Sequence, residues 1–184
     1  MTIKTPFLFF ICFSLTTLSY SQQRYFTKNG NISFAAGSGE DIDGVNKTTT
    51  SIFDATSGQI EFAVLVKGFE FKRSLMQAHF NENYMESEKY PKSIFKGTIS
   101  NINTVNFKKD GLYPVTVKGV LDMHGIKKEL QAAGTLKVTG ETVSTNAEFT
   151  VLLADYNIEI PSLVKDKISK TVTIKVNCNY NVLK

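Results

Sequence analysis

The stretch that decides the fold is TVTIKVNCNYNV, residues 171–182. Every even position in it is apolar, and every odd position is polar or charged. Because successive side chains of a β-strand point to opposite faces, this alternation predicts a strand with one buried and one exposed face. A shift of one residue would move the whole apolar set into water, so the pairing register is well specified. Cys178 lies on the apolar face, where a thiol is expected to behave as a small buried hydrophobic group.

The same period of two recurs in several runs towards the N-terminus. Glycine-containing turns at residues 110–111, 124–125 and 140–141 separate some of these runs, and glycine accepts the positive φ that tight hairpins need. Strands joined by such hairpins are antiparallel, and long antiparallel strands most easily satisfy their edges by closing into a barrel. The eight predicted strands span residues 31–36, 42–53, 58–67, 93–106, 112–123, 126–139, 142–154 and 168–183.

One segment breaks this pattern, between Arg73 and Tyr84. It shows no alternation and contains good helix formers, and several of its residues fall at spacings that share one helical face. We expect a short amphipathic helix here, followed by a loop that Pro91 ends. The predicted fold class is therefore all-β with a short helix, built as an eight-stranded antiparallel β-barrel. The residues on the shared helical face are Leu75, Met76, His79 and Phe80.

Residues 1–21 have the features of a secretory signal peptide. A lysine provides a positive start, the apolar run 6–15 follows, and the small residues Ser19 and Ser21 fit a cleavage site. That run is too short to span a bilayer as a helix, although an uncleaved anchor is the alternative. Removal of the signal leaves residues 22–184 as a single domain. We expect the mature protein to be periplasmic or secreted, with no transmembrane span.

The charges and reactive residues argue against nucleic-acid binding, a metal site and catalysis. The formal net charge is +4, and the lysines are interleaved with acids instead of forming one basic face. The two histidines, His79 and His124, lie on different predicted elements, and turn chemistry at a hairpin tip accounts for His124. The sequence has no cysteine cluster, complete calcium loop or Gly-x-Ser-x-Gly nucleophile turn. We therefore predict a protein that is not an enzyme and has no metal or cofactor.

The inward faces of the predicted strands are almost purely apolar, with a surplus of Phe, Val, Ile and Leu. A barrel of eight strands has an interior just wide enough for side chains to fill it or for one slim ligand. From the residues alone, a filled barrel and a barrel that holds a ligand are equally favoured.

Three segments carry residue orders that point beyond composition. A His-apolar pair in His79–Glu86 is followed by Tyr-Pro and an aromatic residue in Tyr90–Phe95. Val117–Glu129 contains a hairpin of the form L-x-x-H-G-x-x-K, and Phe149–Pro161 contains a strand end of the form F-x-V-x-x-x-D-Y. In this order and spacing, the segments resemble the YceI-like family of exported, lipocalin-like proteins. The resemblance runs from about Ile32 to the C-terminus.

Two positions depart from the family pattern. The family commonly has His-Ser in its first strand, where this chain has Gly30–Phe34, and often Arg-Asp before the helix histidine, where this chain has Met76-Gln77. Those polar residues would suit the head group of a ligand. Their replacement indicates either a less polar ligand or a barrel mouth that has lost binding.

The resemblance implies an extended, lipocalin-like barrel with a helix over one region and a tunnel for a polyisoprenoid or fatty-acyl chain. The function it favours is that of an exported carrier or storage protein that binds a long apolar lipid or polyisoprenoid inside its barrel. Two alternatives stay open: an interaction protein with a filled barrel that binds a partner through its surface, and an enzyme acting around His79. Pairing of two copies into a homodimer is also left open. The residues expected to contact the ligand are Phe34, Phe62, Val64, Leu75, Met76, His79, Phe80, Phe95, Phe149, Val151, Ile174 and Val176.

Overall fold

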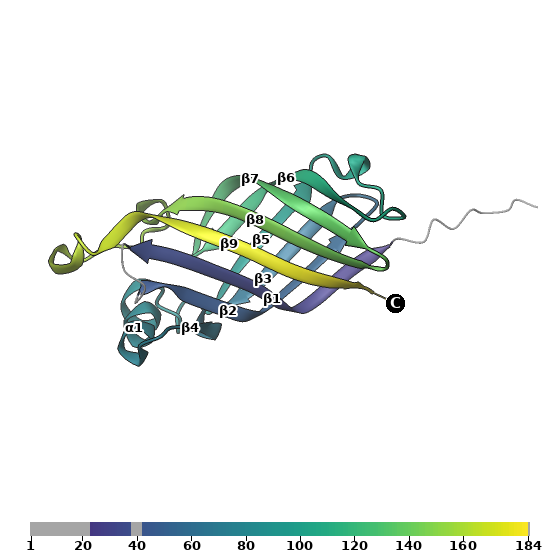
Figure 1. Ribbon diagram of the computed structural model, residues 1–184. Helices are drawn as coiled ribbons and strands as arrows, with labels where there is room; N and C mark the ends of the chain where they lie inside the picture. The colour runs from purple at the N-terminus through teal and green to yellow at the C-terminus, as the bar shows by residue number, and fades with distance from the viewer. Residues whose placement is uncertain (1–22, 38–41, 184) are drawn as a thin grey trace, which may run out of the picture.

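The computed structural model describes residues 23–37 and 42–183, and the predicted signal peptide, residues 1–21, lies outside them. The described residues form one long, twisted barrel (Figure 1). Its strands are β1 (Arg24–Gly37), β2 (Gly44–Asp54), β3 (Gln59–Leu65), β4 (Phe69–Glu70), β5 (Lys92–Ile99), β6 (Gly111–Met123), β7 (Ile126–Thr139), β8 (Thr142–Leu152) and β9 (Ile168–Val182). The α-helix is α1 (Ser74–His79), and the shorter helical turns are η2 (Val66–Gly68), η3 (Phe80–Tyr84), η4 (Ile102–Thr104), η5 (Leu153–Tyr156) and η6 (Ser162–Val164).

The eight longer strands close into an antiparallel barrel, which confirms the predicted fold class. They follow the order β1-β9-β8-β7-β6-β5-β3-β2, and β2 pairs with β1 again to complete the ring. The two-residue strand β4 pairs with β2 at Val45 and Asn46, beyond the reach of β3. Closure leaves none of the eight strands as an exposed edge, which removes the main route by which sheets aggregate.

The register follows the alternation seen in the sequence. Inward-facing Val176 of β9 lies opposite Ile32 of β1 and Ala147 of β8, so apolar side chains meet across all three strands. At the tip of the β6–β7 hairpin, His124 and Gly125 both have positive φ, at 52° and 75°. Two successive positive φ angles are typical of the tight turn whose twist matches paired strands.

Two predicted strands differ from the observed ones. The first was predicted at 31–36, but β1 starts at Arg24, and the strand predicted at 93–106 ends as β5 at Ile99. In the first half of β1, the inward-facing side chains are Tyr25 and Thr27. Both carry a hydroxyl group, so the sequence there does not alternate between apolar and polar residues. After Ile99 the chain leaves the sheet for the turn η4.

One end of the barrel, which we call the base, is packed solid. Five side chains there are almost completely excluded from water: Tyr25, Phe53, Leu136, Val138 and Tyr180. The rings of Tyr25 and Phe53 stack with centroids 4.8 Å apart, and Phe53 meets Tyr180 edge-on at 5.1 Å. The buried Tyr180 hydroxyl lies 2.8 Å from Ser51 Oγ, which itself donates to the carbonyl oxygen of Glu61. The buried hydroxyl groups of Tyr180 and Ser51 are therefore paired.

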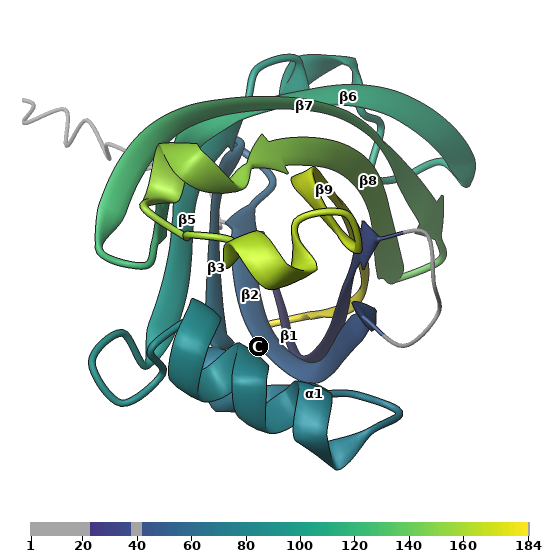
Figure 2. The same ribbon diagram turned by 90° about the vertical axis from the view of Figure 1, so that its left-hand side faces the viewer.

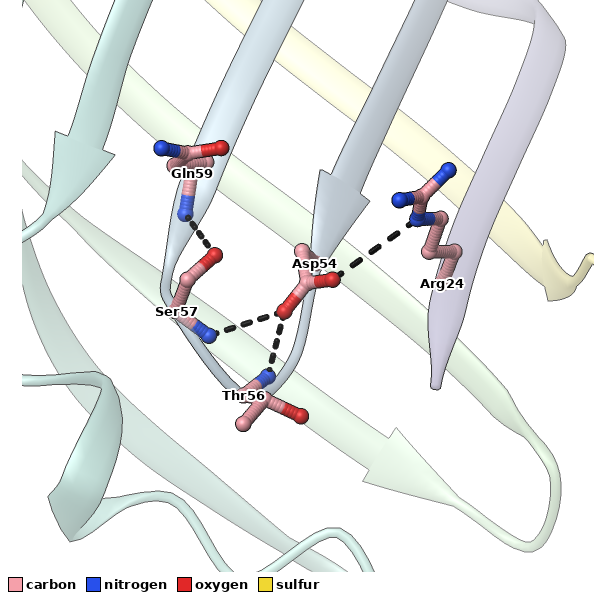
Figure 3. A network of polar contacts seen from close by, with 5 residues as sticks. All are labelled: Arg24, Asp54, Thr56, Ser57 and Gln59. Carbon is pink, nitrogen blue, oxygen red and sulfur yellow. Dashed lines mark hydrogen bonds and ion pairs between the residues drawn. The ribbon is translucent and has the colours of Figure 1, made fainter. Parts of the chain in front are cut away.

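A carboxylate fixes the β2–β3 turn at the same end (Figure 3). Asp54 Oδ1 accepts hydrogen bonds from the backbone N–H groups of Thr56 and Ser57, at 2.9 and 2.8 Å. Its other oxygen lies 3.7 Å from Nε of Arg24 on β1. Burial acts to raise the pKa of Asp54, but the Ser57 and Thr56 hydrogen bonds and the Arg24 charge outweigh it and lower the pKa. The ionised carboxylate thus ties β1 to the turn.

The opposite end, which we call the mouth, carries α1, η3, η5 and η6 (Figure 2), whereas η4 lies at the base beside the β2–β3 turn. The predicted helix is present as α1, and the π-helical turn η3 continues it to Tyr84. The segment between β8 and β9, with η5 and η6, crosses in front of the barrel when the molecule is viewed along its axis. Cys178, predicted to be buried, is 2 % exposed deep in the barrel, and burial raises the pKa of its thiol to about 11.

Candidate ligand-binding cavity

An apolar cavity of about 220 Å³ occupies the barrel between the solid base and the mouth. A single buried water needs only about 10–15 Å³ on the same scale, so the interior is far from filled. The lining side chains come from seven of the eight barrel strands, all but β2, and from the segments at the mouth. The apolar side chains of the strands that line the cavity include Ile32, Phe34, Ile60, Phe62, Val64, Phe95, Val115, Val117, Leu121, Leu130, Ala132, Ala147, Phe149, Val151, Val172, Ile174 and Val176.

Small residues keep the middle of the barrel open. Ala132 of β7 lines the cavity opposite Val117 of β6, and Ala147 of β8 faces Gly134. A side chain at Gly134 has no room, because a Cβ there would lie 2.5 Å from the carbonyl oxygen of Asn146. The larger phenyl rings sit on the strands around this row of small side chains. The sequence thus leaves the interior unfilled where a slim molecule would pass.

An aromatic cluster forms the wall of the cavity nearest α1. Phe34 of β1 contacts the rings of Phe69, Phe71 and Phe80, with centroids 5.3, 5.8 and 5.4 Å apart. Phe80, the first residue of the π-helical turn, also meets Phe69 and Phe71 at 5.4 and 5.0 Å. Aromatic side chains give large apolar contact areas, so the cluster makes this wall a strong site for hydrocarbon.

The lining of the cavity is almost entirely apolar. Among the described residues that line it, none is charged, and the polar side chains are limited to Ser93, Tyr84, Thr135, Thr145 and Asn146. Burial raises the pKa of the Tyr84 phenol above its ordinary value, so this group stays neutral. Such a lining favours a ligand with a long apolar portion and disfavours a charged one, because a buried charge needs a partner.

Nine of the twelve residues expected to contact a ligand line the cavity. The other three, all on α1, do not. Leu75 points outward with 54 % of its surface exposed, and His79 Nδ1 lies 3.1 Å from the Asn83 amide instead of facing the barrel. Met76 is half-buried but is not part of the cavity wall. Of the predicted helical face, only Phe80 reaches the interior. The nine lining residues are Phe34, Phe62, Val64, Phe80, Phe95, Phe149, Val151, Ile174 and Val176.

Several lining residues at the mouth were missed by the sequence interpretation. Met85, Met123, Leu153 and Ile158 all line the cavity, yet each lies at the end of an element or in a loop. Met123 and Leu153 continue the period of two of the predicted strands 112–123 and 142–154, which already places them on the inward face. Met85 and Ile158 lie in segments without a strand or helix period, so nothing in the local pattern marks them as inward-facing. The apolar motif F-x-V-x-x-x-D-Y ending in Tyr156 is the signal that pointed to this region.

The described residues contain no cluster of three or more His, Cys, Asp or Glu side chains that could hold a metal ion. In the same part of the chain, no helix is both long and apolar enough to cross a membrane.

A comparison with models of known protein families finds a match over most of the chain. The sequence model of the YceI-like domain matches residues 20–180. The chain belongs to the YceI-like family. The resemblance seen in the three sequence motifs is thereby confirmed, and it extends twelve residues further towards the N-terminus than Ile32, to residue 20. Comparison with curated proteins finds no significant match.

Solved structures share the fold of this YceI-like chain at low sequence identity. A polyisoprenoid-binding domain from Saccharophagus degradans, described as implicated in plant cell wall breakdown, has a TM-score of 0.74 at 12 % identity and covers 89 % of this chain and 100 % of its own. BcnA from Burkholderia cenocepacia has a TM-score of 0.67 at 14 % identity, covering 82 % and 95 %. A YceI protein from Campylobacter jejuni has a TM-score of 0.55 at 12 % identity, covering 99 % of each chain. At these identities the likeness shows the fold.

Proposed function

We propose that the barrel binds one long apolar lipid or polyisoprenoid, and that the protein carries or stores this molecule after export. The observation that carries the proposal is the apolar cavity inside the barrel, which has no charged lining residue among those described. A binding role of this kind needs no catalytic group.

The energetics of such binding are favourable. Each buried methylene contributes roughly 0.8 kcal/mol, so ten buried methylenes would contribute about 8 kcal/mol before the costs of ordering the chain. The related domain from Saccharophagus degradans is described as polyisoprenoid-binding, which supports a ligand of this class.

Export is the second part of the proposal. The predicted signal peptide at residues 1–21 would direct the chain to the periplasm or out of the cell. A free isoprenoid or acyl chain is insoluble in these aqueous compartments, which gives a carrier its purpose. N-terminal sequencing of the mature protein tests this part, and a chain that still begins at Met1 would contradict it.

The interaction-protein alternative is less favoured. It requires a filled barrel, whereas the cavity of about 220 Å³ leaves the centre of the barrel open.

The decisive experiment is organic extraction of the purified protein followed by mass spectrometry. We expect a long-chain lipid or isoprenoid close to one molecule per barrel, and re-binding of cis-parinaric acid, a fluorescent long-chain fatty acid, after extraction. Lipid-free protein that also fails to bind cis-parinaric acid and farnesol would refute the proposal.

A further inference from the structure

A buried histidine joins three separate segments at the mouth of the barrel. His124, at the β6–β7 hairpin tip, is 7 % exposed. Its Nδ1 lies 2.8 Å from the carbonyl oxygen of Tyr156, and its Nε2 lies 2.9 Å from Oε2 of Glu86. The ring of Tyr90 packs edge-on against the imidazole with centroids 4.6 Å apart. The hairpin is thus bonded on one side to the loop after η3 and on the other to η5.

The backbone is unusual at each of the three joined segments. Among the described residues, positive φ outside glycine occurs at Glu86, His124 and Asn157. Two of these residues form the contact, and the third directly follows Tyr156. Non-glycine residues adopt this conformation at a cost and keep it when their surroundings hold them there. The concentration of such residues at one contact marks it as a place where the fold is held in a specific arrangement.

Each joined segment also carries one wall of the cavity. Met85 precedes Glu86, Met123 precedes His124, and Ile158 lies two residues after Tyr156. All three of these apolar side chains are buried and line the cavity. The segment that carries Ile158 is the one that crosses the mouth in Figure 2. Holding the three backbones together therefore holds three wall residues in place at the mouth.

The groups that the His124 ring faces determine the roles of its two nitrogens. The Tyr156 carbonyl oxygen can only accept, so Nδ1 carries the hydrogen of that bond. When Nε2 is also protonated, Glu86 accepts the second hydrogen bond and balances the charge. Two lysines lie near the contact. Lys89 Nζ lies 3.8 Å from Oε1 of Glu86, the carboxylate oxygen that does not face His124, and Lys128 Nζ lies 3.7 Å from Oδ1 of Asp155.

We propose that the contact of His124 with Tyr156 and Glu86, which we call the clasp, closes the mouth of the cavity. Breaking of this contact sets the rate at which ligand enters and leaves. This inference rests on the proposed lipid-binding function. The clasp holds Met85, Met123 and Ile158 together, and their separation opens the path between the aromatic cluster and solvent. His124 acts on the ligand through these neighbours, so it is a positioning residue.

The sharpest test is His124→Asn. Asparagine tolerates positive φ and is a favoured partner of a following glycine in a tight hairpin turn, so the turn itself is kept. Its side chain is too short to reach both Tyr156 and Glu86. Stopped-flow fluorescence with cis-parinaric acid should show both the association and the dissociation rate constants raised at least threefold. Because both rates pass through the same opening, Kd should change by less than twofold.

Asp54→Ala is the matched control. It removes a comparable three-point contact at the base, because the Asp54 carboxylate accepts from the Thr56 and Ser57 N–H groups and lies beside Arg24 (Figure 3). It should lower Tm while leaving both rate constants within twofold of the parent protein. Equal acceleration by this variant would show that lost stability, not a mouth clasp, sets the rates. Unchanged rates in His124→Asn, or a faster dissociation matched by an equally weakened Kd, would overturn the proposal.

Hydrogen–deuterium exchange gives a readout that needs no ligand. In His124→Asn, backbone amides of residues 85–90, 123–126 and 153–158 should exchange at least fivefold faster, with the base strands unaffected. Unchanged exchange in those three segments would refute the clasp even for a barrel that binds no lipid. Faster exchange without any ligand binding would instead refute the proposed function and leave the clasp standing.

Discussion

Filling the cavity from one strand gives the sharpest prediction about ligand binding. Ala132 of β7 lines the cavity, whereas the next residue, Ala133, is exposed on the outside of the barrel. In Ala132→Phe, the new ring would take the place of about four methylene groups of a ligand tail, each worth roughly 0.8 kcal/mol. The loss of about 3 kcal/mol corresponds to a Kd weakened by more than about 100-fold.

The same change should leave folding stability nearly intact. Burying the ring gains about 1.5–3 kcal/mol, and crowding against Val117 on the paired strand costs about 1–3 kcal/mol. Titration with cis-parinaric acid and urea unfolding of Ala132→Phe and the control Ala133→Phe check both expectations. Tight binding by Ala132→Phe, or equal loss in both variants, would refute the assignment of the cavity as the binding site.

Three further predictions concern the base. The lowered pKa of Asp54 means that its carboxylate stabilises the fold above the ordinary value of 3.8, and that this stability is lost as the pH falls below it; the urea midpoint of Asp54→Asn should therefore fall less on acidification than that of the parent. Tyr180→Phe removes the hydroxyl that pairs with Ser51 and should lower the free energy of unfolding by about 1 kcal/mol. Cys178, with its raised thiol pKa of about 11, should react with Ellman's reagent at pH 8 only after guanidinium unfolding.

Each of these has a clear contrary result. An identical acid response in Asp54→Asn would mean that folding does not lower the pKa of this carboxyl group. Full stability of Tyr180→Phe would mean that the Ser51 contact contributes nothing. Rapid labelling of Cys178 in the native protein would place this thiol at the surface.

The strands were predictable wherever burial follows a strict period of two. The alternation in residues 171–182 predicted β9 almost to the residue, because each side chain there is clearly apolar or polar. The hairpin at His124-Gly125 was also placed correctly, because glycine is typical of such turns. The start of β1 was not, because its buried face carries Tyr25 and Thr27, whose hydroxyl groups are paired locally with the Gln23 amide and the Asn29 N–H. In the sequence alone, a buried polar residue of this kind looks the same as an exposed one.

In the candidate site, too, the residues on strands could be predicted from the sequence and those on the helix could not. Phe62, Phe149 and Ile174 were placed in the barrel interior correctly, since strand alternation determines which way they point. Leu75 was not, because a six-residue helix offers several apolar faces, and docking against the barrel decides which one is buried.

His124 illustrates a further limit of sequence patterns. Its turn conformation was evident from the following glycine, but its two hydrogen-bond partners lie 32 and 38 residues away in the sequence. Only closure of the barrel brings Glu86 and Tyr156 to the same ring. A contact made by three loops has no local pattern that would reveal it.

The pairing of the first strand with the last has a consequence for the order in which the protein can be made. Tyr25 of β1 lies opposite Val182 of β9, and Leu183 N–H donates to the carbonyl oxygen of Arg24. The ring therefore cannot be completed until the 15 residues of β9 have left the ribosome. Such distant pairings fold slowly, and the growing chain keeps unpaired strands until synthesis ends. If the protein is exported as proposed, its barrel is still unclosed while the chain is being made, which would favour transport before folding.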